Sequence, residues 1–284
     1  MRRLQLLVPA LWLAGFVALP LLVVLLLSIA QPGPGVPPFL LPFAWDGGLV
    51  LRPNWEPFGL LVADDYYVSA FLQSLWVAGG TAGLCLLLGF PMALGIARAT
   101  PRWRAPLLMA VLLPFWTGFL PRVGAWIGLL RDEGWVNGVL RGLGWIDAPL
   151  PLLYSDLALF LGMVHAYLPF AVLPLYASLS RLDLTLEEAA SDLGATPATV
   201  FRTITLPLAA PGALAAFLLV FIPAAGEYVI PELLGPPEAL LVGRALWQEF
   251  FQNRDWPVAA ALAVALLAML ILPIRLFQRL EARR

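Results

Sequence analysis

Lysine is absent from this sequence of 284 residues, and all 17 basic residues are arginines. A phosphate-binding loop of the GxxxxGK[ST] type needs a lysine to reach the phosphates, and an enzyme that forms a Schiff base needs a side-chain amine. Neither can be built from this chain alone. A nucleotide site that serves the protein must therefore lie in another chain.

Cysteine and histidine occur once each, as Cys85 and His165. A single cysteine cannot form a disulfide within the chain, and the two residues together cannot complete a structural zinc site. Cys85 lies within an apolar run and not beside a base. Both are interpreted as packing residues, so we expect neither a metal site nor a catalytic residue.

Charge is scarce, at 12% of the residues against roughly a quarter in soluble domains. Hydrophobic residues make up 61%, and the net charge of −1 gives a pI near 5.8. A nucleic-acid partner is excluded, because it would require a basic excess or a basic face. These values instead predict a protein whose main solvent is the lipid bilayer.

Six stretches are long and apolar enough to cross a bilayer, which takes about 20 residues of helix. The apolar runs are continuous and do not alternate, so they predict helices and not barrel strands. The expected fold is all-α, a polytopic membrane protein with six transmembrane helices. The spans are placed near residues 5–30, 70–97, 105–130, 157–180, 206–230 and 256–276.

The first span has an alternative interpretation as a signal peptide. Arg2 and Arg3 precede it, and Ser28, Ile29 and Ala30 resemble a small-x-small cleavage site. A signal peptide has an apolar core of about 7–15 residues, whereas residues 4–30 carry no charge at all. The length favours a retained first transmembrane helix over residues 1–30.

The arginines indicate the orientation. Eleven lie at the termini and in the second and fourth connections, and five lie in the other connections, with Arg122 inside a span. By the positive-inside rule both termini are cytoplasmic, including the tail 278–284. Residues 31–65 are then a periplasmic loop, rich in Pro and Gly and without a helical period. The outer connections are acidic and rich in Trp, which is typical of a docking rim.

The connection between the fourth and fifth spans, residues 181–212, is the most polar stretch on the predicted cytoplasmic side. Thr185 is expected to cap a short helix, with Glu188 three residues later completing a capping box. Gly194 suits the end of that helix, because a left-handed backbone costs glycine nothing.

A second helix is expected to start directly afterwards and to run towards Pro207. Thr196 is its expected N-cap, and Pro197 occupies the first position, where its missing N–H is harmless. The first helix carries a face of small residues beside charges, which suits a groove on another protein. A plain surface helix that joins two spans is the alternative.

The spacing of the residues in this loop favours a helix that binds in a groove on another protein. It follows the pattern E-A-A-x3-G-x9-I-x-L-P and resembles the EAA motif of bacterial ATP-binding-cassette importer permeases. The matching residues are Glu188, Ala189, Ala190, Gly194, Ile204, Leu206 and Pro207. The resemblance implies a type I (MetI-like) permease fold with a core over residues 66–277 and a coupling helix at 185–206 that contacts the ATPase.

The resemblance also implies partners. These are a second, related permease subunit, two ATPase subunits that bind ATP and Mg, and a periplasmic solute-binding protein, all at the bacterial inner membrane. The chain itself would then hold no cofactor and have no enzymatic activity. An autonomous channel or secondary carrier is disfavoured, because it has no use for a helix that docks on an ATPase.

Four further segments are similar to the spermidine/putrescine permeases, namely residues 112–130, 167–183, 218–235 and 254–262. The implied solute is a polyamine. Importers of other small solutes share parts of these segments, so an amino-acid derivative or an anion stays open as the alternative.

A polycation needs carboxylates and aromatic faces along its path. Glu227 is the first candidate, since it ends an uncharged run just after Pro223. Tyr228, Trp116 and Tyr167 are the aromatic candidates. The alternatives are a solvated Glu227 at the headgroup level and aromatics that merely pack or anchor at the interface.

Arg122 is the fifth candidate for the path and points to a different chemistry. A guanidinium inside a membrane is costly unless it is paired, and it would suit an anionic solute. The favoured interpretation is a structural role near the outer end of the third span, where an acidic neighbour neutralises it.

Overall fold

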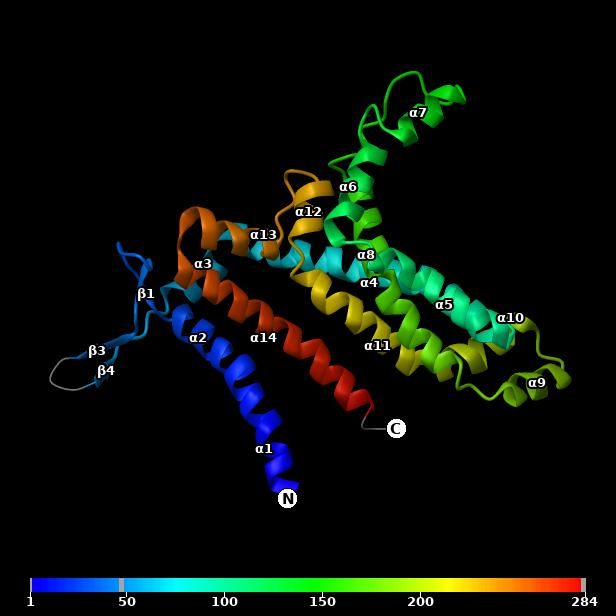
Figure 1. Cartoon of the computed structure of the whole chain (residues 1–284), viewed down its shortest axis with the longest axis horizontal. Coiled ribbons are helices and arrows are strands. Elements are labelled where there is room, and N and C mark those ends of the chain that lie inside the picture. The colour runs from blue at the N-terminus through cyan, green and yellow to red at the C-terminus, as the bar shows by residue number, and fades with distance from the viewer. Residues whose placement is uncertain (1, 46–48, 282–284) are drawn as a thin grey trace. The chain divides into compact units, whose positions relative to one another are not determined.

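The computed structural model describes residues 2–45 and 49–281, and most of them are helical (Figure 1). The chain divides into two compact units. The first contains residues up to Leu72 together with Leu240–Leu272, and the second contains Gln73–Ala239 and the residues from Pro273 onward.

Five helices are long and apolar enough to cross a membrane. Each overlaps a predicted span, which confirms the helical interpretation of the apolar runs. The first consists of α1 (Arg2–Leu13), the π-helical turn η1 (Ala14–Ala18) and α2 (Leu19–Ser28). The others are α4 (Asp65–Arg98), α8 (Asp156–Leu179), a helix over Pro197–Ala225, and α14 (Trp256–Glu281).

The third predicted span is not one straight helix. It is broken after α5 (Pro101–Trp116), and α6 (Phe119–Leu130) begins the next segment. The direction of the segment Phe119–Gly142 differs from that of α5 by 86°. Pro114 precedes the break, and Thr117 and Gly118 have extended backbones with ψ of 141° and 152°. The described helices thus give six spans only if this bent pair counts as one. Uninterrupted hydrophobicity concealed the break, because composition does not report backbone direction.

The fifth span lies earlier in the chain than predicted, at 197–225 instead of 206–230. It comprises α10 (Pro197–Val200), the π-helical turn η2 (Phe201–Thr205) and α11 (Leu206–Ala225). The predicted second cytoplasmic helix is therefore not separate but forms the first turns of the span. Pro207 did not end it, because a wider π-helical turn precedes this proline, and such turns accommodate an interrupted hydrogen-bond ladder.

The segment predicted as an outer loop, residues 31–65, contains short strands and a helix among its described residues. β1 (Gln31–Pro32) pairs with β2 (Phe39–Leu40), and β3 (Phe43–Trp45) pairs with β4 (Leu49–Leu51), both antiparallel. The helix α3 (Glu56–Ala63) follows. Sequence reasoning missed this helix, although Pro57 in its first turn is a start signal. The strands are minor additions to an otherwise helical fold.

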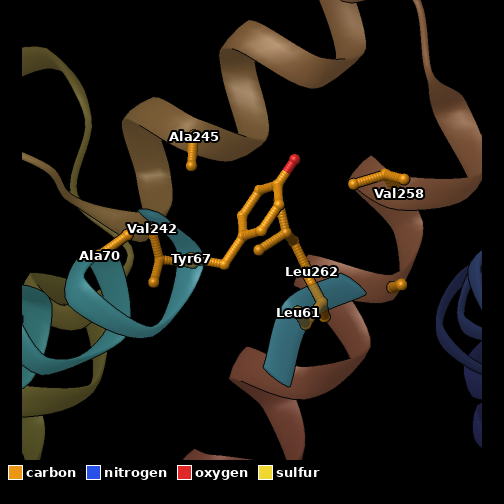
Figure 2. Packing of buried hydrophobic residues seen from close by; sticks show 8 residues of the cluster. Leu61, Tyr67, Ala70, Val242, Ala245, Val258 and Leu262 are labelled. Atoms are coloured by element: carbon orange, nitrogen blue, oxygen red, sulfur yellow. The ribbon is translucent and has the colours of Figure 1, made fainter. Parts of the chain in front are cut away.

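The core of the first unit joins α3, the start of α4, α13 (Val242–Trp247) and α14. Figure 2 shows Tyr67 projecting between these helices, with Ala245, Val258 and Leu262 around it. Its hydroxyl donates to Glu249 Oε1 at 2.8 Å. Glu249 lies in the π-helical turn η3 (Gln248–Asn253) and is 8% exposed. A buried carboxylate of this kind needs such partners.

The core of the second unit rests on the packing of α8 against α11. Gly212 lies so close to α8 that a Cβ atom there would meet Ser178 Cβ at 2.3 Å. Small residues at such points let membrane helices approach closely. Two shorter helices belong to this unit, α7 (Trp135–Gly142) and α12 (Val229–Leu234), and α12 packs on α6 and α8.

Candidate functional site

The polar connection after α8 folds into the short helix α9 (Leu184–Asp192), which lies with α10 at the end of α8 and α11 away from α12 (Figure 1). Its N-cap is Asp183, whose Oδ1 accepts the backbone N–H of Thr185 at 3.0 Å. The predicted cap at Thr185 and its capping box with Glu188 are therefore wrong. An aspartate two residues earlier is an equally favoured cap, and the helix starts there.

The end of α9 matches the prediction. Gly194 has φ of +87°, the left-handed region that glycine enters without strain. The N–H of Ala195 donates to the carbonyl of Ala190 at 3.0 Å and closes the turn. Thr196 then caps the next helix, its Oγ1 accepting the N–H of Thr199 at 3.3 Å, and Pro197 follows in the first turn as predicted.

The predicted contact residues lie largely on the surface of this loop. Glu188, Ala189, Gly194, Leu206 and Pro207 are exposed, and Ala190 and Ile204 are half-buried. Sequence reasoning missed the leucines beside them. Leu193 is 90% exposed, and Leu184 and Leu186 are about half exposed. Leu184 also lines the cavity beside α9, whereas Leu193 protrudes at the end of the helix. The signal was present in the sequence, as leucines at positions flanking the motif.

Glu187 was also missed, and it faces the rest of the unit. Its Oε1 accepts from Arg98 Nη2 at 2.5 Å and from Thr205 Oγ1 at 2.7 Å. Arg98 is the last residue of α4, and Thr205 ends η2. A cavity of about 540 Å³ adjoins this contact, lined in part by Leu94, Leu184 and Phe201. Spacing could not reveal Glu187, because its partners are 89 and 18 residues away.

At the other end of α11, the structure brings together two of the predicted path residues. Tyr167 Oη donates to Glu227 Oε2 at 2.5 Å. The second oxygen of Glu227 accepts the backbone N–H groups of Tyr228 at 3.2 Å and Val229 at 3.0 Å. Glu227 is half-buried, and its carboxylate holds the N-cap residue and the first residue of α12. These contacts differ from those of a carboxylate that is only solvated at the headgroup level.

Arg122 lies in the first turn of α6. Its Nε and Nη1 atoms are buried without a hydrogen-bond partner among the described residues. The guanidinium lies over the rings of Phe115 and Phe119, 5.6 and 5.9 Å from their centroids. The expected acidic neighbour is thus not found within the described part of the chain, and aromatic faces take its place.

Aromatic rings connect these two charged positions. The ring of Phe115 meets Phe170 at 5.6 Å, and Phe170 lies 6.2 Å from Tyr167. Trp116, at the end of α5, is 73% exposed and takes no part in these ring contacts. Within residues 2–45 and 49–281, no group of three or more His, Cys, Asp or Glu could hold a metal ion.

Residues 57–284 match a protein family described as the inner membrane component of binding-protein-dependent transport systems. The spermidine/putrescine transport system permease protein PotB of Escherichia coli is 37% identical over 216 residues, which cover 76% of this chain and 78% of that protein. PotB of Haemophilus influenzae is 35% identical over 213 residues, 75% of this chain and 74% of its own length.

One solved structure illustrates the shared fold. A bacterial alginate ABC transporter, in complex with its periplasmic protein carrying an alginate pentasaccharide, aligns with a TM-score of 0.69 and 18% identity. The alignment covers 99% of this chain and 93% of that one. At this identity the likeness shows the fold alone, that of a type I importer permease.

Proposed function

Because this chain belongs to the family of inner membrane components of binding-protein-dependent transport systems, we propose that it is one permease subunit of an ATP-driven polyamine importer. Its place as a multi-pass inner membrane protein follows from the family and from its apolar helices. The solute, the ATPase contact and the assembly are the proposal.

The observation that carries the ATPase contact is the exposed helix α9. It presents Glu188 and Ala189 beside the protruding leucines, and Gly194 ends it in a left-handed turn that only a few residue types adopt. A short, capped helix with exposed polar and apolar side chains fits a cleft on a soluble subunit. ATP and Mg bind to that subunit, and this chain contributes the docking helix but no group to hydrolysis.

We propose an assembly of this chain, a second related permease, two ATPase subunits and a periplasmic binding protein. Both termini and α9 are cytoplasmic, in keeping with the 11 arginines on that side against five on the other. The hairpins, α3 and the turn around η3 then face the periplasm, where the binding protein docks.

The proposed solute is a polyamine such as spermidine or putrescine. The identity to PotB over three quarters of the chain supports this class. The half-buried carboxylate of Glu227 beside Tyr167, with Phe170 and Phe115 continuing the aromatic series, supplies the two kinds of group that attract an organic cation.

A second solute class is favoured by Arg122. Two of its nitrogens lack a partner among the described residues, so a solute that carries an anionic group, including an amino-acid derivative, could pair with it. The same machinery would then carry a solute with a different charge.

Uptake in cells tests the proposal. The chain is expressed with the genes of its partner subunits in a bacterium that lacks its own polyamine uptake systems. We expect energy-dependent accumulation of labelled spermidine or putrescine that unlabelled polyamine abolishes. Accumulation of an anionic or zwitterionic solute instead would move the assignment to the second class, and no accumulation of any solute would contradict the importer.

A further inference from the structure

Two adjacent glutamates on α9 differ in their exposure and in their side-chain contacts, although both line the cavity beside α9. Glu188 is exposed, and its side chain has no hydrogen bond or ion pair within the part of the chain that the structure describes. Glu187 is turned towards the unit, with a side chain only 21% exposed. The geometry points to a division of roles in which Glu188 faces the ATPase and Glu187 fastens α9 to the membrane helices.

One carboxylate oxygen of Glu187, Oε1, accepts both side-chain hydrogen bonds that connect it to other elements. It accepts from Arg98 at the end of α4 and from Thr205 at the start of α11. Three elements that are separate in the sequence therefore meet at one atom. We call the set Arg98, Glu187 and Thr205 the α9 latch.

A second contact beside the latch joins the same two long helices. The ring of Phe201 in η2 meets Phe90 of α4 edge to face at 5.6 Å. Thr205 lies in the same π-helical turn, and turns of this kind frequently mark functional positions in helices. The start of α11 is thus held both by an aromatic contact to α4 and by the polar contact to α9.

The polar contact adds little to folding stability, because Arg98 and Glu187 are 32% and 21% exposed and water competes for both. The contact instead restricts the orientation of α9. A carboxylate that holds two donors on two helices restricts how α9 can tilt, whereas a flexible linker would let α9 move alone. Charge-assisted hydrogen bonds give such geometric control.

We propose that Glu187 is a positioning residue for coupled transport. This inference rests on the proposed function. The latch makes α9 move as one body with α4 and α11, so that displacement of α9 by the ATPase reaches the helices that enclose the solute path. Without it the ATPase still docks through Glu188 and its neighbours, but part of each displacement is lost.

The test compares variants in the complete complex, reconstituted in lipid vesicles with saturating binding protein. Solute uptake and ATP hydrolysis are followed together, and their ratio is the readout. For Glu187→Gln we expect normal assembly and normal basal hydrolysis, with solute moved per ATP lower by about two- to thirtyfold, the range of coupling changes along such networks. Thr205→Val should have a smaller effect, since Arg98 remains bound.

A charge exchange separates positioning from simple disruption. Arg98→Glu combined with Glu187→Arg restores the ion pair with its direction reversed, and we expect it to recover most of the ratio that either single change loses. The matched control is Glu188→Gln, which should weaken ATPase docking and lower both uptake and hydrolysis together.

Two results would overturn the latch. One is a wild-type ratio for Glu187→Gln in an assembled complex, and the other is a double variant no better than its single parents. Failure of the proposed function looks different, because the unchanged chain would then neither assemble with an ATPase nor support uptake.

Discussion

At the scale of single residues, the proposed polyamine solute implies a role for the negative charge of Glu227. Glu227 is half-buried, and it accepts hydrogen bonds from Tyr167 and from two backbone N–H groups at the start of α12. A carboxylate with these three donors keeps its place when no solute is present. It can therefore attract a cation without first reorganising.

Replacing Glu227 with Gln keeps the shape and an acceptor oxygen but removes the charge. If a cationic solute passes this residue, we expect uptake to fall by about tenfold or more, since a hydrogen bond to a charged group contributes about 1.5–3 kcal/mol. Spermidine, with more charges than putrescine, should be affected more strongly.

Tyr167→Phe is the matched control, because it removes the hydroxyl bonded to Glu227 and leaves the charge. It should reduce uptake less, and equally for both polyamines. Unchanged uptake of every polyamine by Glu227→Gln, measured in vesicles with hydrolysis followed in parallel, would remove Glu227 from the path.

Gly194 supplies a second prediction at this scale. A Cβ atom added there would meet no other side chain or segment of the described residues within 4 Å, so the cost of a side chain lies in the φ of +87°. Gly194→Val should cost about 1–2 kcal/mol in the left-handed conformation, unwind the end of α9 and reduce the fraction of chain that copurifies with the ATPase.

Gly194→Asn is the control, because asparagine enters the left-handed region more easily than other residues with side chains. It should retain most of the ATPase binding. Equal losses for Val and Asn would show that the ATPase excludes any side chain at this position, and wild-type binding by Val would contradict the role of the turn.

At the scale of elements, the packing of α8 on α11 depends on Gly212. The Ala side chain in Gly212→Ala would collide with Ser178, whose Cβ would be 2.3 Å away. Overpacking of this kind typically costs about 1–3 kcal/mol. We expect a lower thermal unfolding temperature of the purified chain in detergent, and partial recovery when Ser178→Gly is added.

Gly83→Ala in α4 provides the comparison, because a Cβ atom there has no neighbour within 4 Å among the described residues outside its own helix backbone. Its unfolding temperature should be unchanged or slightly higher, since alanine favours helix over glycine. If both alanine variants unfolded at the wild-type temperature, the close approach of α8 and α11 would not be a determinant of stability.

The elements also show what the sequence could predict. Long apolar runs marked the spanning helices, and Gly194, Thr196 and Pro197 marked the turn between α9 and α10, because hydrophobicity and turn chemistry are local properties. The 86° break at Thr117 and Gly118 and the continuity of 197–225 through Pro207 were missed. Both depend on backbone direction, which tertiary contacts decide.

The candidate site was predictable to a similar degree. Spacing placed the contact residues on one short loop, but the cap at Asp183 and the inward position of Glu187 were not foreseen. The pairing of Glu227 with Tyr167 was not foreseen either, because 60 residues separate them. Contacts between distant segments require the fold itself.

At the scale of the whole molecule, the excess of arginine on one side predicts the orientation. Reporter fusions at both ends and within the hairpin segment 31–45 test it. An alkaline phosphatase reporter should be active in the hairpin and inactive at the termini. An active reporter at the C-terminus would contradict the topology, and cleavage near Gln31 in the mature protein would support the signal-peptide interpretation of the first span.

The claim that joins all three scales is that ATP hydrolysis on a partner chain drives a polyamine through this one. Its most direct test is uptake of labelled spermidine by lipid vesicles that contain the purified complex, with ATP on the side of α9 and solute-loaded binding protein on the opposite side. The account predicts accumulation against a gradient, in proportion to ATP hydrolysed, and its loss when ATP or binding protein is omitted. Equilibration of spermidine at the same rate without ATP would contradict it and indicate a channel or carrier.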